Sequence, residues 1–260
     1  MEIGKLISEI FSKNAVMDEN GKEIALSANI DQEEGAFLSQ IVASVKPERS
    51  IEVGCANGIA SLFICAELEK LKNRRHTIID PNQATEWKNA GKTNLKRAGV
   101  EFFELIEKPS EIALPELYAA GKRFDFGFID GWHTFDHTLI DFFYIDKMIN
   151  INGIIVIDDV SFPSINKLIR YILLNYPSYV QVDHLPDKNM IKPTGLKAFG
   201  TSFIKTTFKL FSKLIPSKNR YRFFASNVMV SDEKLNLGSS MIALKKIKED
   251  ERSWDWYKDF

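Results

Sequence analysis

Three acidic residues are placed where two neighbouring strands of a parallel sheet would end. Asp130 follows the apolar run 124–129, and Asp158 and Asp159 follow the run 154–157. Carboxylates this close repel one another unless a cation lies among them. Oxygen ligands favour a hard ion such as Mg²⁺, so Asp130, Asp158 and Asp159 are the predicted metal ligands. The alternative is that Asp158 and Asp159 only open the next loop and cap a helix.

Two histidines follow the first acid at positions that suit proton transfer. His133 lies three residues after Asp130, and His137 lies four residues further along. Imidazole changes its charge near neutral pH, so we predict that His133 is the general base, with Asp130 beside it as a second catalytic residue. His137 is the alternative base or an extra metal ligand, because a helix starting at Thr134 would put it on the same face.

A loop with two glycines follows the apolar run 50–53 and precedes a helix expected to begin near Ile59. Gly54 and Gly58 let the backbone pass close to a ligand. The dinucleotide fingerprint G-x-G-x-x-G is absent, which argues against NAD or FAD. Glu52 would repel a pyrophosphate but suits the positive sulfonium and amino groups of S-adenosylmethionine. The predicted cofactor site therefore includes Glu52, Gly54, Cys55, Ala56, Asn57 and Gly58.

Further cofactor contacts are expected after the next two strands. Asp80 ends the second strand, where an acid accepts hydrogen bonds from both ribose hydroxyls in nucleotide-binding α/β folds. The alternative is that Asp80 opens the turn Asp80-Pro81-Asn82. Ser110 and Glu111 follow the third strand and are placed to face an adenine, unless Ser110 is a plain helix N-cap. Asp80, Pro81, Ser110 and Glu111 join the predicted cofactor site.

The elements that must position these residues are visible between about residues 48 and 185. Short β-branched runs alternate there with longer amphipathic stretches, which is typical of βαβ units around a parallel sheet. A helix is expected over 32–45, and in open α/β sheets ligands bind at the loops after the strands. The expected strands are 50–53, 76–79, 102–106, 124–129, 154–157 and 179–182, with an edge or near-edge strand at 240–246.

A basic segment, Lys188 to Arg222, contains nine Lys or Arg residues and no Asp or Glu. Its apolar residues follow helical spacing up to Pro216, which predicts a basic amphipathic helix. Two interpretations remain open: packing on its own domain or on a second subunit, and contact with a membrane surface or an anionic substrate. The apolar positions are Ile204, Phe208, Phe211 and Ile215, with Lys205, Lys209 and Lys213 beside them.

Composition limits the remaining possibilities. The 260 residues are 45% hydrophobic, and 34 Lys and Arg nearly balance 35 Asp and Glu, so no nucleic-acid partner is expected. Cys55 and Cys65 are expected to be reduced packing residues, and a cytoplasmic location is expected since no apolar run could span a membrane. The predicted parts are an N-terminal helical segment (1–46), a cofactor-binding core (47–185), the basic insertion (186–225), and the final strands with a polar tail (226–260).

Taken in order, these motifs resemble the cation-dependent type of class I S-adenosylmethionine-dependent O-methyltransferases. Ile30 to Leu62, with its Glu-Gly-x-Phe-Leu run and glycine loop, resembles the opening of the catechol and caffeoyl-CoA O-methyltransferases. Phe124 to Val160, with Asp-Gly-Trp-His and Asp-Asp, resembles the macrocin-type sugar O-methyltransferases. The resemblance covers about residues 25 to 185.

The resemblance implies a Rossmann-like, doubly wound α/β fold: a seven-stranded, mostly parallel sheet with a reversed last strand and helices on both faces. It also implies that S-adenosylmethionine lies over the tips of the first two strands, that Asp130 contributes to this site, and that Trp132 flanks the adenine. The chain has His133 where the catechol type has a lysine base, and Asp159 where it has asparagine. These departures favour a sugar or other aliphatic hydroxyl as acceptor over a catechol.

Three other classes compete with this interpretation. A nucleic-acid base methyltransferase normally carries an Asn/Asp-Pro-Pro-aromatic run at the fourth strand, which Asp130-Gly131-Trp132 does not match. A non-catalytic S-adenosylmethionine-binding module would have no need of three clustered acids. A dehydrogenase would need the dinucleotide glycines. The sequence thus predicts methyl transfer to a small-molecule hydroxyl, assisted by Mg²⁺ or another divalent cation.

Overall fold

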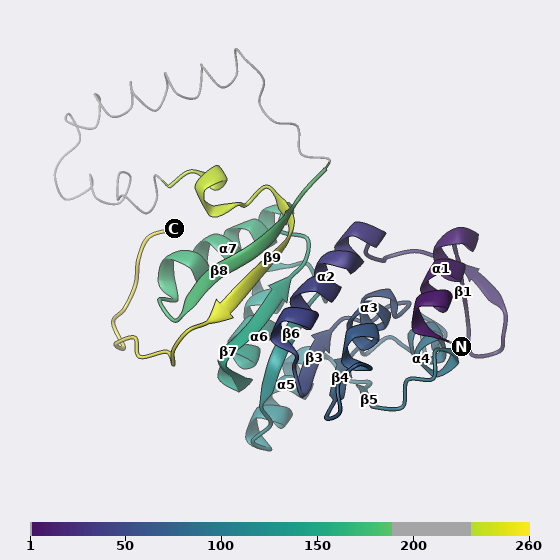
Figure 1. The fold of residues 1–260 in the computed structure, drawn as a ribbon. Helices are drawn as coiled ribbons and strands as arrows, with labels where there is room; N and C mark the ends of the chain where they lie inside the picture. The colour runs from purple at the N-terminus through teal and green to yellow at the C-terminus, as the bar shows by residue number, and fades with distance from the viewer. Residues whose placement is uncertain (1, 189–229) are drawn as a thin grey trace, which may run out of the picture.

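The computed structural model describes residues 2–188 and 230–260 as an α/β fold (Figure 1). Its N-terminal part comprises α1 (Ile3–Lys13), β1 (Ala15–Met17), β2 (Glu23–Ala25) and α2 (Gln32–Val45). The later helices are α3 (Ile59–Leu68), α4 (Ala90–Arg97), α5 (Ser110–Ala119), α6 (Phe135–Met148) and α7 (Pro163–Asn175). A short 3₁₀ helix, η2 (Asp232–Leu235), precedes the last strand.

A seven-stranded sheet in the described part of the chain has the order β5-β4-β3-β6-β7-β9-β8. Its strands are β3 (Arg49–Val53), β4 (Arg75–Ile79), β5 (Phe103–Ile106), β6 (Phe124–Ile129), β7 (Ile149–Ile157), β8 (Tyr179–Pro186) and β9 (Ser239–Lys246). Neighbouring strands pair in parallel except β9, which is antiparallel to both β7 and β8. The predicted doubly wound sheet with a reversed last strand is confirmed.

Helices cover both faces of the sheet, and this explains the nearly continuous apolar runs in its central strands. In β7, Ile154 and Val156 pack into a core shared with α1 to α4, whereas Ile155 and Ile157 pack into a second core shared with α5, α6 and α7. In Figure 1, α2 and α3 lie in front of the sheet and α6 lies behind it. The carboxyl ends of the parallel strands consequently remain open to form a site.

The N-terminal region contains more than the predicted helices. The predicted helix over 32–45 is confirmed, and the Asp31 carboxylate caps it by accepting hydrogen bonds from the backbone N–H groups of Glu33 and Glu34, at 2.8 and 2.9 Å. Between α1 and α2, however, β1 and β2 form an antiparallel hairpin. Each of its strands has three residues, which is too short for a periodic pattern to reveal.

Most of the basic segment lies outside the described residues, including Ile204, Phe208, Phe211 and Ile215 of its predicted helix. Lys188 is described, and its Nζ pairs with Asp31 at 3.1 Å. Among residues 2–188 and 230–260, no helix is long and apolar enough to cross a membrane.

The end of β3 lies unusually close to the end of β6. Gly54 has φ +89°, and a Cβ at this position would lie 1.9 Å from the carbonyl oxygen of Asp130. Backbone hydrogen bonds fix the same edge: Gly54 N–H donates to Ile79 at 2.9 Å, and Asp130 N–H donates to Val53 at 2.9 Å. Only glycine allows this approach, so the conformation of the loop depends on Gly54.

We predict that Gly54→Ala lowers the free energy of unfolding by about 3 kcal/mol or more, since it adds both backbone strain and a clash with the main chain of β6. Gly99→Ala is the matched control, because Gly99 has φ +77° but nothing within 4 Å of the added methyl group. Backbone strain alone predicts that Gly99→Ala lowers the free energy of unfolding by about 1 kcal/mol. Urea denaturation measures both values, and equal losses would contradict the close-approach explanation.

Candidate active site

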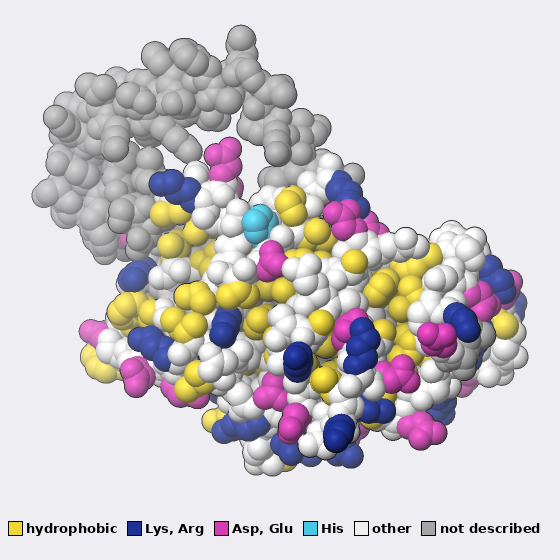
Figure 2. Space-filling model, in the orientation of Figure 1, with side chains coloured by type: hydrophobic (Ala, Val, Ile, Leu, Met, Phe, Trp, Pro, Cys, Tyr) yellow, Lys and Arg dark blue, Asp and Glu magenta, His cyan; other side chains and the backbone are white. Residues whose placement is uncertain are grey.

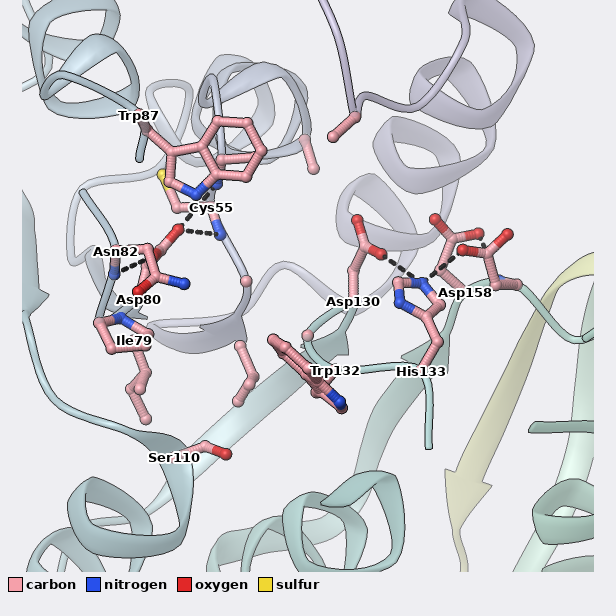
Figure 3. A pocket seen from close by; sticks show the side chains of 18 of the residues that line it. Cys55, Ile79, Asp80, Asn82, Trp87, Ser110, Asp130, Trp132, His133 and Asp158 are labelled. Carbon is pink, nitrogen blue, oxygen red and sulfur yellow. Dashed lines mark hydrogen bonds and ion pairs between the residues drawn. The ribbon is translucent and has the colours of Figure 1, made fainter. Parts of the chain in front are cut away.

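A cavity of about 870 Å³ opens at the carboxyl ends of β3, β4, β6 and β7. Its volume lies within the range of about 300 to 1,000 Å³ that is usual for small-molecule sites. Figure 3 shows the glycine loop and Asp80 on one side of it and Asp130, His133 and Asp158 on the other. The cavity therefore joins the predicted cofactor loop to the predicted acidic cluster.

Asp80 holds the glycine loop in place. Its Oδ2 accepts hydrogen bonds from the backbone N–H groups of Cys55 and Ala56, at 3.1 and 2.9 Å, and from Gln83 Nε2 at 3.0 Å. Its Oδ1 accepts from the Asn82 N–H at 2.8 Å, the turn interaction that the alternative interpretation anticipated. Asp80 also lines the cavity. Loop fixation and turn formation are thus observed, and the ribose contact remains a prediction.

Glu52 does not line the cavity, although we predicted that it would contact the cofactor. It is 0% exposed, and its Oε2 lies 2.7 Å from His76 Nε2 and accepts a hydrogen bond from Ser61 Oγ at 2.8 Å. Since both faces of β3 are buried, strand alternation alone could not tell which face leads to the site. Glu52 lies on the face covered by α3, where His76 and Ser61 are its partners.

The remaining loop residues divide between the cavity and the protein interior. Gly54, Cys55 and Ala56, three of the predicted cofactor-binding residues, line the cavity. Asn57 is buried instead, and its Nδ2 donates to the Ser27 carbonyl at 2.6 Å. Gly58 lies against Gly91, where a Cβ would be 2.9 Å from the Gly91 Cα. These two residues shape the loop rather than face a ligand.

Asp130, His133 and Asp159 bring their ligand atoms within 4.8 Å of one another, an arrangement that could hold a metal ion. His133 Nε2 lies 3.6 Å from Asp130 Oδ1 and forms an ion pair with Asp159. Asp158 lines the same cavity, and its Oδ1 accepts a hydrogen bond from the Asp159 N–H at 2.8 Å. The three predicted acids are therefore together, but the tightest group includes His133 in place of Asp158.

The negative charges of Asp130 and Asp159 affect the predicted role of His133 as the general base. Its hydrogen bonds to Asp130 and Asp159 raise the pKa of His133 to about 10. Burial raises the pKa of Asp130 to about 6, and burial together with Asp130 and Asp159 raises the pKa of Asp158 well above its usual range. At neutral pH His133 is protonated in this arrangement. It cannot accept a further proton while Asp130 and Asp159 remain paired with it.

Trp132 and His137 lie at the mouth of the cavity. Trp132 is 65% exposed, and its ring centroid lies 6.2 Å from that of His137. His137 Nδ1 lies 2.8 Å from Thr134 Oγ1 at the start of α6. His137 lines the cavity but does not join the acidic cluster, which makes it a poor candidate for an extra metal ligand.

Several lining residues were not predicted from the sequence. Glu34 belongs to the Glu-Gly-x-Phe-Leu run, which was the only signal for it. Asn82 was expected only as part of the turn after Asp80, and nothing in the sequence marked Glu86 or Trp87. In the described part of the chain the lining contains no Lys or Arg. Its carboxylates are Glu34, Asp80, Glu86, Glu111, Asp130, Asp158 and Asp159. The cavity is thus suited to a positively charged ligand.

Comparison with known proteins agrees with this site. Residues 51–160, which include the glycine loop and all three clustered acids, match the model of a family described as a methyltransferase domain. This part of the chain is therefore similar to a methyltransferase domain. No curated protein matches the sequence.

Solved structures resemble most of the fold around residues 51–160. The cofactor-bound Rv0187 from MTB has a TM-score of 0.55 at 16% identity, covering 85% of this chain and 82% of that one. An O-methyltransferase from Bacillus cereus in complex with SAH has a TM-score of 0.54 at 15% identity, with coverages of 69% and 81%. TomG, an O-methyltransferase from Streptomyces achromogenes in complex with SAM, has a TM-score of 0.53 at 16% identity, with coverages of 69% and 82%. At these identities the similarity shows the fold.

Behind the cavity, Asp141 of α6 supports Ser110, which lines the cavity together with Pro81 and Glu111. Asp141 is 1% exposed, and its carboxyl interacts with the Ser110 hydroxyl. Burial raises the pKa of Asp141 to about 6. The folded protein thus binds this proton more tightly than the unfolded chain, where the pKa is about 3.9. The stability that Asp141 contributes is full below about pH 4 and is lost as the pH rises through about 6.

We predict that Asp141→Asn raises the free energy of unfolding by about 2 kcal/mol at pH 7.5 and leaves it nearly unchanged at pH 4, because the amide carries no charge to bury. Urea denaturation at both pH values measures the difference. Asp136→Asn, an exposed change on the same helix, should give no such gain. An equal effect of Asp141→Asn at the two pH values would contradict the raised pKa.

Proposed function

We propose that this protein is an S-adenosylmethionine-dependent methyltransferase that transfers the methyl group to a hydroxyl oxygen of a small molecule, with a divalent cation bound beside the cofactor. The observation that carries the proposal is the single cavity in which Gly54, Cys55 and Asp80 face Asp130, His133 and Asp159. A non-catalytic cofactor-binding module would not need the cluster of Asp130, His133 and Asp159. Similar folds in O-methyltransferases with bound SAH or SAM support the choice of cofactor and reaction.

The residues of the cavity fit S-adenosylmethionine in shape and charge. The Gly54 loop lines the cavity and packs against the backbone of Asp130, and Asp80 holds that loop in place from the side of β4. The cofactor has a positive sulfonium, and the described lining is acidic without Lys or Arg. Trp132 and Ser110 would lie at its adenine end, and Asp80 near its ribose. The main chain of Asp130 packs against Gly54, so a sulfonium bound over the ends of β3 and β6 would lie near the Asp130 carboxylate.

The clustered acids also fit a divalent cation. His133 Nε2 is buried between the carboxylates of Asp130 and Asp159, which present oxygen atoms around it. A nitrogen with several carboxylate oxygens is a donor set for Mg²⁺, Mn²⁺ or Zn²⁺. When bound, such an ion would lower the pKa of an acceptor hydroxyl and offset the repulsion among Asp130, Asp158 and Asp159.

The chain's own residues would then orient the reaction. Backbone contacts between Gly54 and Asp130 fix the distance between the cofactor loop and the acidic cluster, which favours an in-line approach of oxygen to methyl. Asp130 and Asp159 hold the proton on His133 Nε2 in the free protein. A cation held by Asp130 and Asp159 alone would remove the contacts that raise the pKa of His133, and His133 could then take the hydroxyl proton. If His133 Nε2 were itself a ligand, His137 in the same cavity would be the alternative base.

An uncharged acceptor, such as a sugar or another natural-product-like hydroxyl compound, suits the described lining best. A phosphorylated acceptor would need cationic partners, and the described part of the cavity offers none besides the two imidazoles. The same acidity disfavours a nucleic acid as substrate. Recruitment of an anionic acceptor would depend on residues of the basic segment outside the described ranges.

We predict that the protein binds S-adenosylhomocysteine and that Asp80→Ala weakens this binding about 10- to 100-fold, because the variant frees the loop N–H groups and removes the ribose partner. Titration calorimetry measures the affinity, and Asp136→Ala serves as a control at an exposed aspartate. Unchanged affinity in a folded Asp80→Ala protein would remove Asp80 from the cofactor site.

We further predict that the protein binds Mn²⁺ and that Asp159→Ala weakens this binding at least about tenfold, the usual effect of losing a carboxylate ligand. Calorimetry with the metal alone requires no acceptor, and Asp136→Ala is again the control. Once an acceptor is found, EDTA should abolish methyl transfer and Mg²⁺ or Mn²⁺ should restore it. Full activity in EDTA would return Asp158 and Asp159 to structural roles.

A further inference from the structure

Trp87 lies on the cofactor side of the cavity, in the loop between β4 and α4. Figure 3 shows its indole ring facing the same space as Asp80 and Asn82. Within residues 2–188 and 230–260, no group accepts a hydrogen bond from Trp87 Nε1. A half-buried indole with an unused N–H donor at the edge of a ligand cavity indicates a group that meets the ligand.

The backbone after Trp87 has an unusual conformation. Lys88 and Asn89 have φ values of +50° and +56°, so two consecutive residues other than glycine occupy the left-handed region. This conformation is unfavourable for residues with a Cβ and persists only where surrounding contacts impose it. Within the loop, Trp87 N–H donates to the Asn82 carbonyl at 3.1 Å, and Ala90 N–H donates to the Trp87 carbonyl at 2.8 Å.

The contacts that impose this conformation come from the turn of the β1–β2 hairpin. Glu19 N–H donates to the Lys88 carbonyl at 3.2 Å, and Asn89 Nδ2 donates to Glu19 Oε2 at 2.8 Å. The turn itself is ordered by Asp18, whose Oδ1 accepts from the N–H groups of Asn20 and Lys22 at 2.9 and 2.8 Å. Glu19 therefore contacts both left-handed residues that follow Trp87. In Figure 1, β1 and α1 lie beside α4, at the same end of the sheet.

We propose that Trp87 forms the outer wall of the cofactor's ribose site and that the β1–β2 hairpin, through Glu19, holds it there. This inference rests on the proposed function. Asp80 already accepts four hydrogen bonds from the protein, so much of its capacity is used by the loop. The indole supplies what Asp80 lacks: an apolar face to cover the sugar and an Nε1–H to donate to a ribose oxygen. Glu19 is a positioning residue, since it lies outside the cavity.

The test is a double-mutant cycle on S-adenosylhomocysteine binding, measured by calorimetry with the full chain. Trp87→Ala should raise the Kd about tenfold, while Trp87→Phe, which keeps an aromatic face, should stay within about threefold of wild type. Glu19→Ala should raise the Kd about threefold in the wild-type background and have no further effect in the Trp87→Ala background. Glu23→Ala, an exposed change on the same hairpin that pairs only with Lys13 in the described structure, should leave the Kd unchanged.

A fluorescence readout separates direct contact from loss of structure. In a Trp132→Phe protein, S-adenosylhomocysteine should still change the tryptophan emission, and adding Trp87→Phe should abolish that change, because Trp254 and Trp256 belong to the C-terminal tail. Unchanged affinity in Trp87→Ala, or an equal effect of Glu19→Ala in both backgrounds, overturns the inference while the proposed function stands. Failure of the wild-type protein to bind S-adenosylhomocysteine overturns the proposed function itself.

Discussion

The contact between the backbone of Gly54 and the carbonyl of Asp130 joins the two halves of the site. It brings the end of β3, which carries the glycine loop, against the end of β6, which carries the acidic cluster. Both partners are main-chain atoms of central parallel strands, so their separation cannot change through a rotamer shift. The distance between a ligand in the glycine loop and a group held at Asp130 is consequently set by the sheet itself.

The buried carboxylates make this cavity selective for positively charged ligands. Asp130 and Asp158 are held where burial makes their ionised forms costly, and their pKa values are raised as a result. In the free protein, the charge of His133 offsets part of that cost. A sulfonium and a divalent cation would offset more of it, so the ligands that the site is proposed to bind are those that relieve its repulsion. The face drawn in Figure 2 mixes acidic and basic side chains, whereas the described lining of the cavity has carboxylates and no Lys or Arg.

Hydrophobic periodicity was enough to predict the sheet. The strand at 124–129 and the helix at 32–45 have the predicted bounds, while β7 begins five residues before the expected start, because polar Asn150 and Asn152 hide its first part. The acids at strand ends were also predictable, since parallel strands end at one edge. The ion pairs of these acids with His133 could not be predicted, because they depend on distances across a loop that sequence spacing does not contain.

Most of the differences between the predicted and the observed site involve residues whose partners are distant in sequence. Glu52 lies on the far side of β3 because His76 and Ser61 bind it there, and neither partner is marked by a motif. Asn57 points into the interior, where its side chain donates a hydrogen bond to the carbonyl of Ser27, a residue in a segment without a periodic pattern. Trp87 reaches the cavity through a strained loop that a short hairpin holds. Local patterns predict elements well, whereas these side chains are directed by contacts between elements.

We propose that one cavity holds S-adenosylmethionine with its methyl group beside a cation at Asp130, His133 and Asp159. The most direct measurement is the NMR signal of S-adenosylmethionine labelled with ¹³C in the methyl group and bound to the protein, recorded with Mg²⁺ and then with paramagnetic Mn²⁺. We predict that Mn²⁺ broadens the methyl signal strongly in the wild-type protein and much less in Asp159→Ala. A methyl signal of the bound cofactor that Mn²⁺ leaves unchanged, at a concentration that saturates the protein, would contradict it.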